Sequence, residues 1–128
     1  MIYLDSSVAL AHLLAEDRCP PSSLWQESLV SSRLLQFETW NRINALGLGA
    51  SLGDLVRDVI ARLAIVEMTP RTLARALEPF PVPVRTLDTL HLASMHYLAS
   101  LGQTVRLASY DQRLLEAAGN LGFKEYPL

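Results

Sequence analysis

The stretch that decides the fold is Met1–Leu10, MIYLDSSVAL. Its apolar run Ile2–Leu4 ends at a single carboxylate, Asp5, and the hydroxyls of Ser6 and Ser7 precede a helix-compatible segment. This pattern predicts a buried strand that passes into a helix through a serine N-cap. In an open α/β sheet, an acid at the carboxyl end of a central strand lies where ligands bind. Asp5 is therefore the first candidate functional residue.

The composition predicts one domain over residues 1–128. Half of the residues are hydrophobic, and the mean hydropathy is +0.21. No apolar run approaches the ~20 residues of a spanning helix, and no basic segment precedes the first apolar one, so we expect neither a membrane span nor a signal peptide. The apolar surplus predicts an exposed patch used for association, with a dense core as the alternative.

Charge and cysteine content narrow the class of protein. The formal net charge of −2 argues against a non-specific nucleic-acid binder, which needs a broad basic face. It leaves room for an enzyme that acts on nucleic acid and carries a metal ion among its acidic ligands. The one cysteine, Cys19, cannot form an internal disulfide, so the reducing cytoplasm is the expected location.

Apolar periodicity along the rest of the chain alternates between strand-like and helical segments. Short strands alternating with helices predict an α/β domain with a parallel sheet. A further segment, residues 33–37, fits a short strand or a turn. The predicted strands cover residues 2–4, 64–68, 104–108 and 123–126, and the predicted helices cover residues 7–16, 22–30, 37–46, 52–63, 70–78 and 86–101, with a last helix capped by Ser109 that ends near Gly119.

Four acids stand at comparable places in these elements. Asp5 and Asp111 each follow a predicted strand, whereas Glu38 and Asp88 lie in the first turn of predicted helices. Each has an ordinary explanation, because the helix dipole favours such an acid by about 0.3–1 kcal/mol, and Glu38 can pair with Arg42. Together they are harder to explain, since carboxylates in apolar surroundings are costly to bury unpaired.

Carboxylates gathered at one sheet end raise one another's pKa values unless a divalent cation lies among them. All-oxygen ligation suits Mg²⁺ or Mn²⁺, which keep several waters and recruit phosphate oxygens. Such a site can turn a bound water into a nucleophile and stabilise the leaving oxyanion in phosphodiester hydrolysis.

Four motifs then carry a family resemblance: MIYLDSS at the start, FETWNR around Glu38, RTLDTLHLA around Asp88 and LASYDQRLLEAA around Asp111, with GFKEYP closing the chain. With these motifs the chain resembles the PIN-domain ribonucleases of the VapC toxin type. The resemblance implies a three-layer α/β/α fold with a central, mainly parallel sheet, and metal-dependent endonucleolytic cleavage of RNA to a 5′-phosphate and a 3′-hydroxyl. It also implies a type II toxin–antitoxin system, a homodimer and a VapB-type antitoxin that blocks the site.

The resemblance also assigns residue roles. Four positions match the family's acidic tetrad, which binds Mg²⁺ or Mn²⁺: Asp5, Glu38, Asp88 and Asp111. Three of these are expected to ligate the metal directly, and Glu38 either ligates it or positions the attacking water. Ser7 and Ser109 match positions whose hydroxyls hold the acids or bound water. Ser6 stands where threonine is commoner, and it keeps the hydroxyl.

The other notable polar and aromatic residues fit ordinary roles in the core, at the surface or at an interface. His91 lies three residues after Asp88, and we expect it to be a satisfied core histidine in preference to a metal ligand. His12 is expected at the surface or an interface, and Trp25 and Trp40 in the core or an interface. Four arginines lie near the acids in sequence and can contact RNA phosphates or form surface pairs: Arg33, Arg42, Arg85 and Arg113.

Two rival functions also fit parts of the sequence. A non-catalytic interaction module fits the apolar surface but leaves the four acids unexplained. Another Mg²⁺-dependent phosphohydrolase, of the haloacid-dehalogenase type, also places an acid after its first strand. That fold needs a second Asp close behind the first or a late lysine, but Ser7 takes the first place and Lys124 comes too late.

Overall fold

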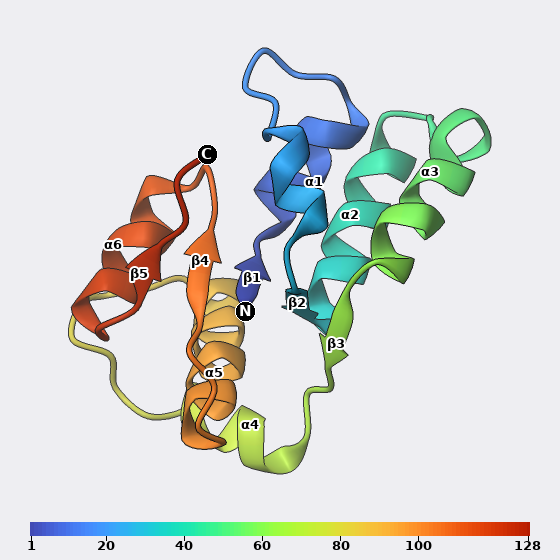
Figure 1. Cartoon of the computed structure of the whole chain (residues 1–128). Coiled ribbons are helices and arrows are strands. Elements are labelled where there is room, and N and C mark those ends of the chain that lie inside the picture. The colour runs from blue at the N-terminus through green and yellow to red at the C-terminus, as the bar shows by residue number, and fades with distance from the viewer.

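A five-stranded parallel sheet organises the computed structural model, which describes residues 1–128 (Figure 1). The strand order is β3-β2-β1-β4-β5, and every neighbouring pair is parallel. The first strand therefore lies at the centre, as its apolar sequence predicts. The strands are β1 (Ile2–Leu4), β2 (Leu29–Ser32), β3 (Ala64–Val66), β4 (Arg106–Ala108) and β5 (Lys124–Glu125).

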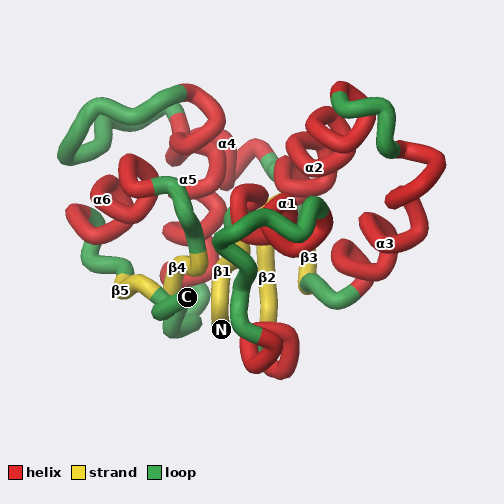
Figure 2. The backbone as a smooth tube through the Cα atoms, turned by 90° about the horizontal axis from the view of Figure 1, so that it is seen from above, coloured by secondary structure: helices red, strands yellow, loops and turns green.

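Helices cover both faces of this sheet, and Figure 2 shows α2 and α3 on one side and α5 and α6 on the other. The predicted three-layer α/β/α architecture is confirmed. None of the helices is both long enough and apolar enough to cross a bilayer. The helices are α1 (Ser6–Leu13), α2 (Arg33–Ala45), α3 (Gly49–Ala61), α4 (Pro70–Ala76), α5 (Thr86–Ser100) and α6 (Gln112–Asn120), with a 3₁₀ helix, η1, at Ser22–Gln26.

The core is divided by the alternation of side chains along β1. Ile2 and Leu4 face one cluster, which α1, α2 and α3 complete. Tyr3 faces the other cluster, together with apolar residues of α5 and α6. In α5, the five residues His91–Met95 are all buried, so every side of the helix is covered there, as its nearly continuous apolar sequence predicts.

The prediction of a helix over residues 22–30 was wrong after its first turn. The chain forms only η1, and Leu29–Ser32 then enters the sheet as β2, beside β1. Ser31 Oγ donates to the Leu4 carbonyl at 2.7 Å, which satisfies a buried hydroxyl within the sheet. The two serines made the strand hard to predict from the sequence, because serine lacks the apolar, β-branched character on which a strand prediction depends.

The prediction of a strand or turn over residues 33–37 was also wrong, because α2 begins at Arg33. Ser32 is its N-cap, and its side chain accepts from the Leu34 amide at 2.9 Å. A strand thus passes directly into a helix through one serine. The boundary lies four residues earlier than the helical pattern indicated.

Exposed apolar side chains are present, as the composition predicts. Leu77 at the end of α4 is 89% exposed, and Leu73 on the same helix is also exposed. With Val84 and Leu90 they line a shallow hollow between α4 and α5. Association through this surface stays a prediction.

Candidate active site

The parallel pairing of β1 with β4 brings two of the candidate acids together. The register sets Leu4 against Ala108, and the Asp5 amide donates to the Ala108 carbonyl at 3.0 Å. Both strands end here at the carboxyl edge of the sheet, where α1 and α6 begin. Asp5 is the N-cap of α1, and Asp111 is the N-cap of α6.

These caps correct the sequence-based assignment of serine caps. At α6, Asp111 Oδ1 accepts from the amides of Arg113 at 3.0 Å and Leu114 at 3.3 Å. Ser109 does not cap the helix: its hydroxyl accepts from the Asp111 amide at 2.9 Å and donates to Asp5 Oδ2 at 2.9 Å. Ser and Asp have similar N-cap preferences, so tertiary contacts decide which of the two residues caps the helix.

All four candidate acids line one open cavity of about 440 Å³, although they are far apart in sequence. The cavity lies at the carboxyl edge of the central strands, the place where open α/β sheets bind ligands. Its other lining residues include Ser7 and Arg85. The four acids are Asp5, Glu38, Asp88 and Asp111.

Asp5 is held by two serine hydroxyls. Its Oδ2 accepts from Ser7 Oγ at 2.6 Å and from Ser109 Oγ at 2.9 Å, and Asp5 is only 6% exposed. Ser7 is fixed in turn, because its hydroxyl accepts from the Tyr110 amide at 3.0 Å. Oδ1 makes no hydrogen bond with the protein and is not sealed from solvent. One carboxylate oxygen is therefore anchored, and the other is left for a ligand.

Asp88 and Asp111 share a cation. Arg85 Nε lies 3.6 Å from Asp88 Oδ2, and Arg85 Nη2 lies 3.3 Å from Asp111 Oδ2. Burial raises the pKa of Asp88, and the neighbouring charges of Asp111 and Asp5 raise it further, against the opposing effect of Arg85. The Arg85 side chain itself is 64% exposed. The guanidinium therefore screens two carboxylates from the solvent side.

Glu38 is fixed by a buried relay that sequence reasoning missed. Its Oε1 lies 2.6 Å from His91 Nε2, and His91 Nδ1 lies 2.7 Å from the Tyr3 hydroxyl. The Ser32 amide donates to the same hydroxyl at 3.2 Å. If Tyr3 donates to Nδ1 and Nε2–H donates to an ionised Glu38, every one of these groups is satisfied. The alternative explanation of Glu38, a pair with Arg42, does not apply, because Glu38 pairs with His91.

His91 is the buried, satisfied histidine that the sequence predicts, with both ring nitrogens partnered. Burial opposes a charged imidazolium, but the hydrogen bond to Glu38 and its negative charge outweigh burial and raise the pKa of His91. The available signal was the spacing: three residues after Asp88, His91 lies one helical turn away on the same side of α5. Nothing in the local sequence names Glu38 as its partner.

Arg85 also had a signal in the sequence. It occupies the N-cap of α5 without capping the helix. A cation is unfavourable there, because the helix dipole is positive at its N-terminus. The carboxylates of Asp88 and Asp111 offset this unfavourable position. Of the other arginines near the acids, Arg33 pairs with Glu67.

The donor set suits a hard divalent cation. The cavity presents four carboxylates, and oxygen ligands of this kind fit Mg²⁺ or Mn²⁺. In the arrangement observed, the acids stand around the wall of the cavity, and no three Asp, Glu, His or Cys side chains converge as a group that could hold a metal. Arg85 supplies the positive charge between Asp88 and Asp111. A metal ion would have to take the place of that guanidinium.

Comparison with known proteins identifies the family. The PIN domain family model matches residues 2–120. Ribonuclease VapC46 of Mycobacterium tuberculosis is 34% identical to this chain over 128 residues, which cover 94% of this chain and 92% of the relative. The chain belongs to the VapC-type PIN-domain family. The family expected from the four sequence motifs is thereby confirmed.

A solved structure is also similar to this chain in its fold. The crystal structure of PAE2754 from Pyrobaculum aerophilum matches with a TM-score of 0.61, covering 91% of this chain and 78% of that one. At 21% sequence identity, this likeness concerns the fold alone.

Proposed function

We propose that residues 1–128 form one PIN-type domain that is a divalent-metal-dependent endoribonuclease, the toxin of a type II toxin–antitoxin pair. The observation that carries this proposal is the single cavity lined by all four acids. The VapC-type family supports RNA as the substrate, a VapB-type antitoxin as the partner, a homodimer and a cytoplasmic location. The exposed leucines of α4 offer an apolar surface for such association.

In this proposal, Asp5, Asp88 and Asp111 hold Mg²⁺ or Mn²⁺. Asp5 presents Oδ1, because Ser7 and Ser109 retain Oδ2. When bound, the cation supplies positive charge that lowers the pKa of a coordinated water and stabilises the leaving oxyanion. Asp88 and Asp111 become free to ligate when Arg85 turns away, which its exposed position permits.

Glu38 orients the attacking water and accepts its proton, or adds a further ligand. His91 holds Oε1 of this carboxylate, so Oε2 is the oxygen that contacts the water. Water adds to the phosphorus, the bond from phosphorus to the 3′-oxygen breaks, and the 3′-oxygen takes up a proton. The products are then a 5′-phosphate and a 3′-hydroxyl.

The proposal is tested by incubating the purified protein with structured RNAs in Mg²⁺, in Mn²⁺ and in EDTA. We expect cleavage with either metal and none in EDTA. Asp88→Asn should abolish cleavage, because it removes a ligand. Asp54→Asn is the matched control, since Asp54 is a fully exposed acid on α3. Cleavage that persists in EDTA, or that survives Asp88→Asn, contradicts the proposed mechanism.

A further inference from the structure

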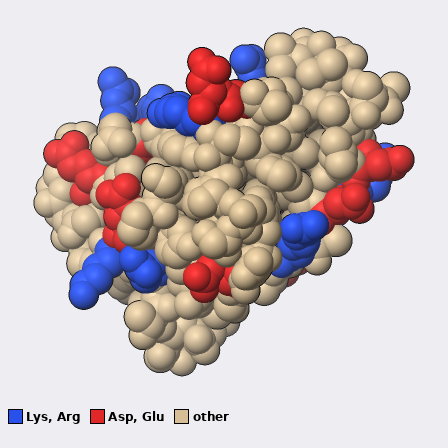
Figure 3. Space-filling model, turned by 45° about the horizontal axis from the view of Figure 1, so that its top comes forward, with Lys and Arg blue, Asp and Glu red and all other residues tan.

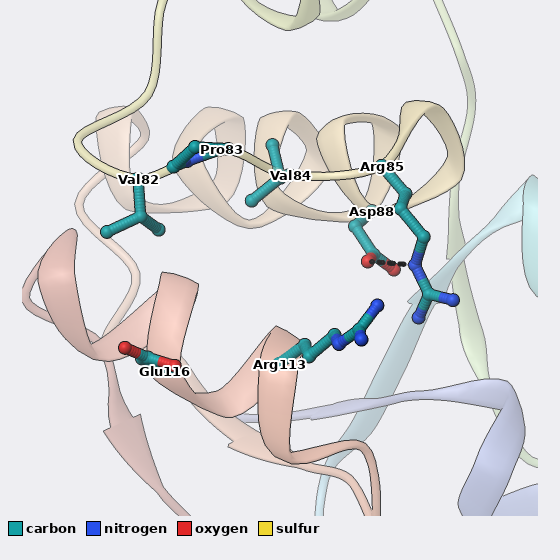
Figure 4. Close-up of a pocket in the computed structure, with 7 residues that line it drawn as sticks. All are labelled: Val82, Pro83, Val84, Arg85, Asp88, Arg113 and Glu116. Atoms are coloured by element: carbon teal, nitrogen blue, oxygen red, sulfur yellow. Dashed lines mark ion pairs between the residues drawn. The ribbon is translucent and has the colours of Figure 1, made fainter.

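A second cavity, of about 540 Å³, adjoins the acid cavity (Figure 4). The two share Arg85 and Asp88 in their linings. Arg85 and Asp88 therefore stand at the border between the cavities, and the second cavity is the neighbouring one for a single-stranded RNA whose scissile phosphate lies among the acids. Its volume falls within the roughly 300–1,000 Å³ typical of small-ligand sites. The lining residues are Val82, Pro83, Val84, Arg85, Asp88, Arg113 and Glu116.

One wall of this cavity is apolar and stiff. It is the connector between α4 and α5, in which Pro83 stands between two valines. Val82 and Val84 are partly buried against the core cluster under α5, which fixes the connector in place. Proline also restricts the backbone. A flat base can pack its face on such a surface, because proteins that bind single-stranded RNA hold unstacked bases on rigid, apolar groups.

The opposite wall is α6, which contributes Arg113 and Glu116 (Figure 4). They are three residues apart, so they lie on the same side of the helix. Figure 4 shows Arg113 extending toward Asp88 and Arg85, whereas Glu116 lies farther along the wall, opposite Val82. The cavity is therefore basic at the end next to the four acids and acidic at the far end.

The two arginines differ in what holds them. Arg85 is engaged by two carboxylates, Asp88 and Asp111. The guanidinium of Arg113 has neither an ion pair nor a hydrogen bond within the protein. An unpartnered guanidinium beside a cavity lined by acids suits a phosphate, which it can bind through two parallel hydrogen bonds.

The formal net charge of −2 argues against a broad basic surface that would compete with this interpretation. On the face shown in Figure 3, basic and acidic side chains are interspersed and form no continuous basic area. RNA affinity must then depend on a few local cations.

Building on the proposed ribonuclease activity, we propose that this second cavity is a subsite for one nucleotide of single-stranded RNA, next to the scissile phosphate. Arg113 binds a backbone phosphate, and the Val82–Val84 wall carries the face of the base. Glu116 accepts a hydrogen bond from an exocyclic amino group. Adenine, cytosine and guanine carry such a group and uracil does not, so the subsite selects against uracil.

Binding in EDTA tests the subsite without catalysis. The probes are a short fluorescent oligouridylate and the same oligomer with one adenosine, and fluorescence anisotropy is measured over a range of salt concentrations. The wild type should bind the adenosine oligomer about 5- to 10-fold more tightly, which is the lower range for one specific base contact. Arg113→Ala should weaken both oligomers alike and reduce the slope of log K against log salt by about 0.7, the loss of one phosphate contact.

Glu116→Gln should remove the preference for adenosine, because an amide can accept from the adenine amino group and can equally donate to a uracil carbonyl. The salt slope should stay that of the wild type, because the phosphate contact of Arg113 is kept. Arg57→Ala and Glu27→Gln are the matched controls. Both residues are exposed, and neither lines either cavity. Thermal melting verifies that each variant is folded.

An unchanged salt slope in Arg113→Ala, or an adenosine preference that persists in Glu116→Gln, overturns the subsite. Cleavage assays in Mg²⁺ and Mn²⁺ keep the two proposals apart. A wild type that shows the binding differences but never cleaves supports the subsite and refutes the nuclease. A wild type that cleaves, with both variants binding as the wild type does, supports the nuclease and refutes the subsite.

Discussion

Asp5 and the pair of Asp88 and Asp111 line the same cavity, but different kinds of groups hold them. Asp5 is buried, and the neutral hydroxyls of Ser7 and Ser109 anchor one of its oxygens. Asp88 and Asp111 are bridged by Arg85, a cation whose side chain is 64% exposed. The buried half is thus prebuilt, because neutral groups of the protein hold it in place. The exposed half is held by a charge that can be displaced.

Removing the charge of the prebuilt half should have the largest effect. Asp5→Asn is expected to lower the RNA cleavage rate by at least about 100-fold, because an anchored ligand for the cation is lost. Mn²⁺ affinity, measured by calorimetry, should fall in parallel. Asp54→Asn should leave both unchanged. A variant that binds Mn²⁺ normally would show that Asp5 is no ligand.

Breaking the hydrogen-bonded relay of Tyr3 and His91 behind Glu38 should have the next largest effect. Tyr3→Phe leaves His91 Nδ1 and the Ser32 amide without their shared buried partner. The expected loss is about 1–3 kcal/mol in the free energy of unfolding, measured by urea denaturation. The free imidazole can also adopt the tautomer that no longer donates to Glu38, so cleavage should slow with little change in KM.

A matched tyrosine tests this interpretation. Tyr97→Phe removes a hydroxyl for which no hydrogen bond occurs, on the same α5 helix as His91. It should change neither stability nor the ¹⁵N shifts of His91. If Tyr3→Phe is as stable as Tyr97→Phe and keeps the ¹⁵N pattern of the wild type, the relay does not set the tautomer.

The displaceable half should respond more weakly. Arg85→Gln removes the cation between Asp88 and Asp111. Exposed ion pairs contribute about 0–1 kcal/mol, so the metal-free protein should lose no more than that in its free energy of unfolding. Mn²⁺ should bind about 2- to 5-fold more tightly, since it no longer competes with a guanidinium. Weaker Mn²⁺ binding in this variant would contradict the displacement of Arg85 by the metal.

The pH dependence of stability should show the smallest effect. The folded-state pKa of His91 is raised above its ordinary value by Glu38. The protonated pair therefore stabilises the fold fully below about pH 6.5, the unfolded value, and this contribution is lost as pH rises through the folded-state pKa. In EDTA, His91→Asn should lack this decline. The exposed His96→Asn should retain it.

The sequence predicted several elements closely, because their patterns were long or sharply bounded. The apolar segment around residues 86–101 is α5 at Thr86–Ser100, and the Thr69-Pro70 start leads into α4 at Pro70–Ala76. The strand after residue 63 covers Ala64–Val66. The failures, in residues 22–37, came where the strand is four residues long and half of them are serines. Strands β1, β3 and β4 are shorter still, at three residues each, but they are largely apolar, so the two serines and not the length concealed β2.

The sequence by itself determined that β1 is a buried strand ending at an acid, which four of the 13 acidic residues are candidates for one site, and the family to which the chain belongs. These features depend on residue types, on local apolar patterns and on the order of the motifs along the chain. Only the tertiary structure decided the partners of each acid. Glu38 meets His91 across 53 positions, and Arg85 meets Asp111 across 26. Such pairs depend on how the sheet orders its strands and how the helices pack, and neither leaves a periodic trace in the sequence.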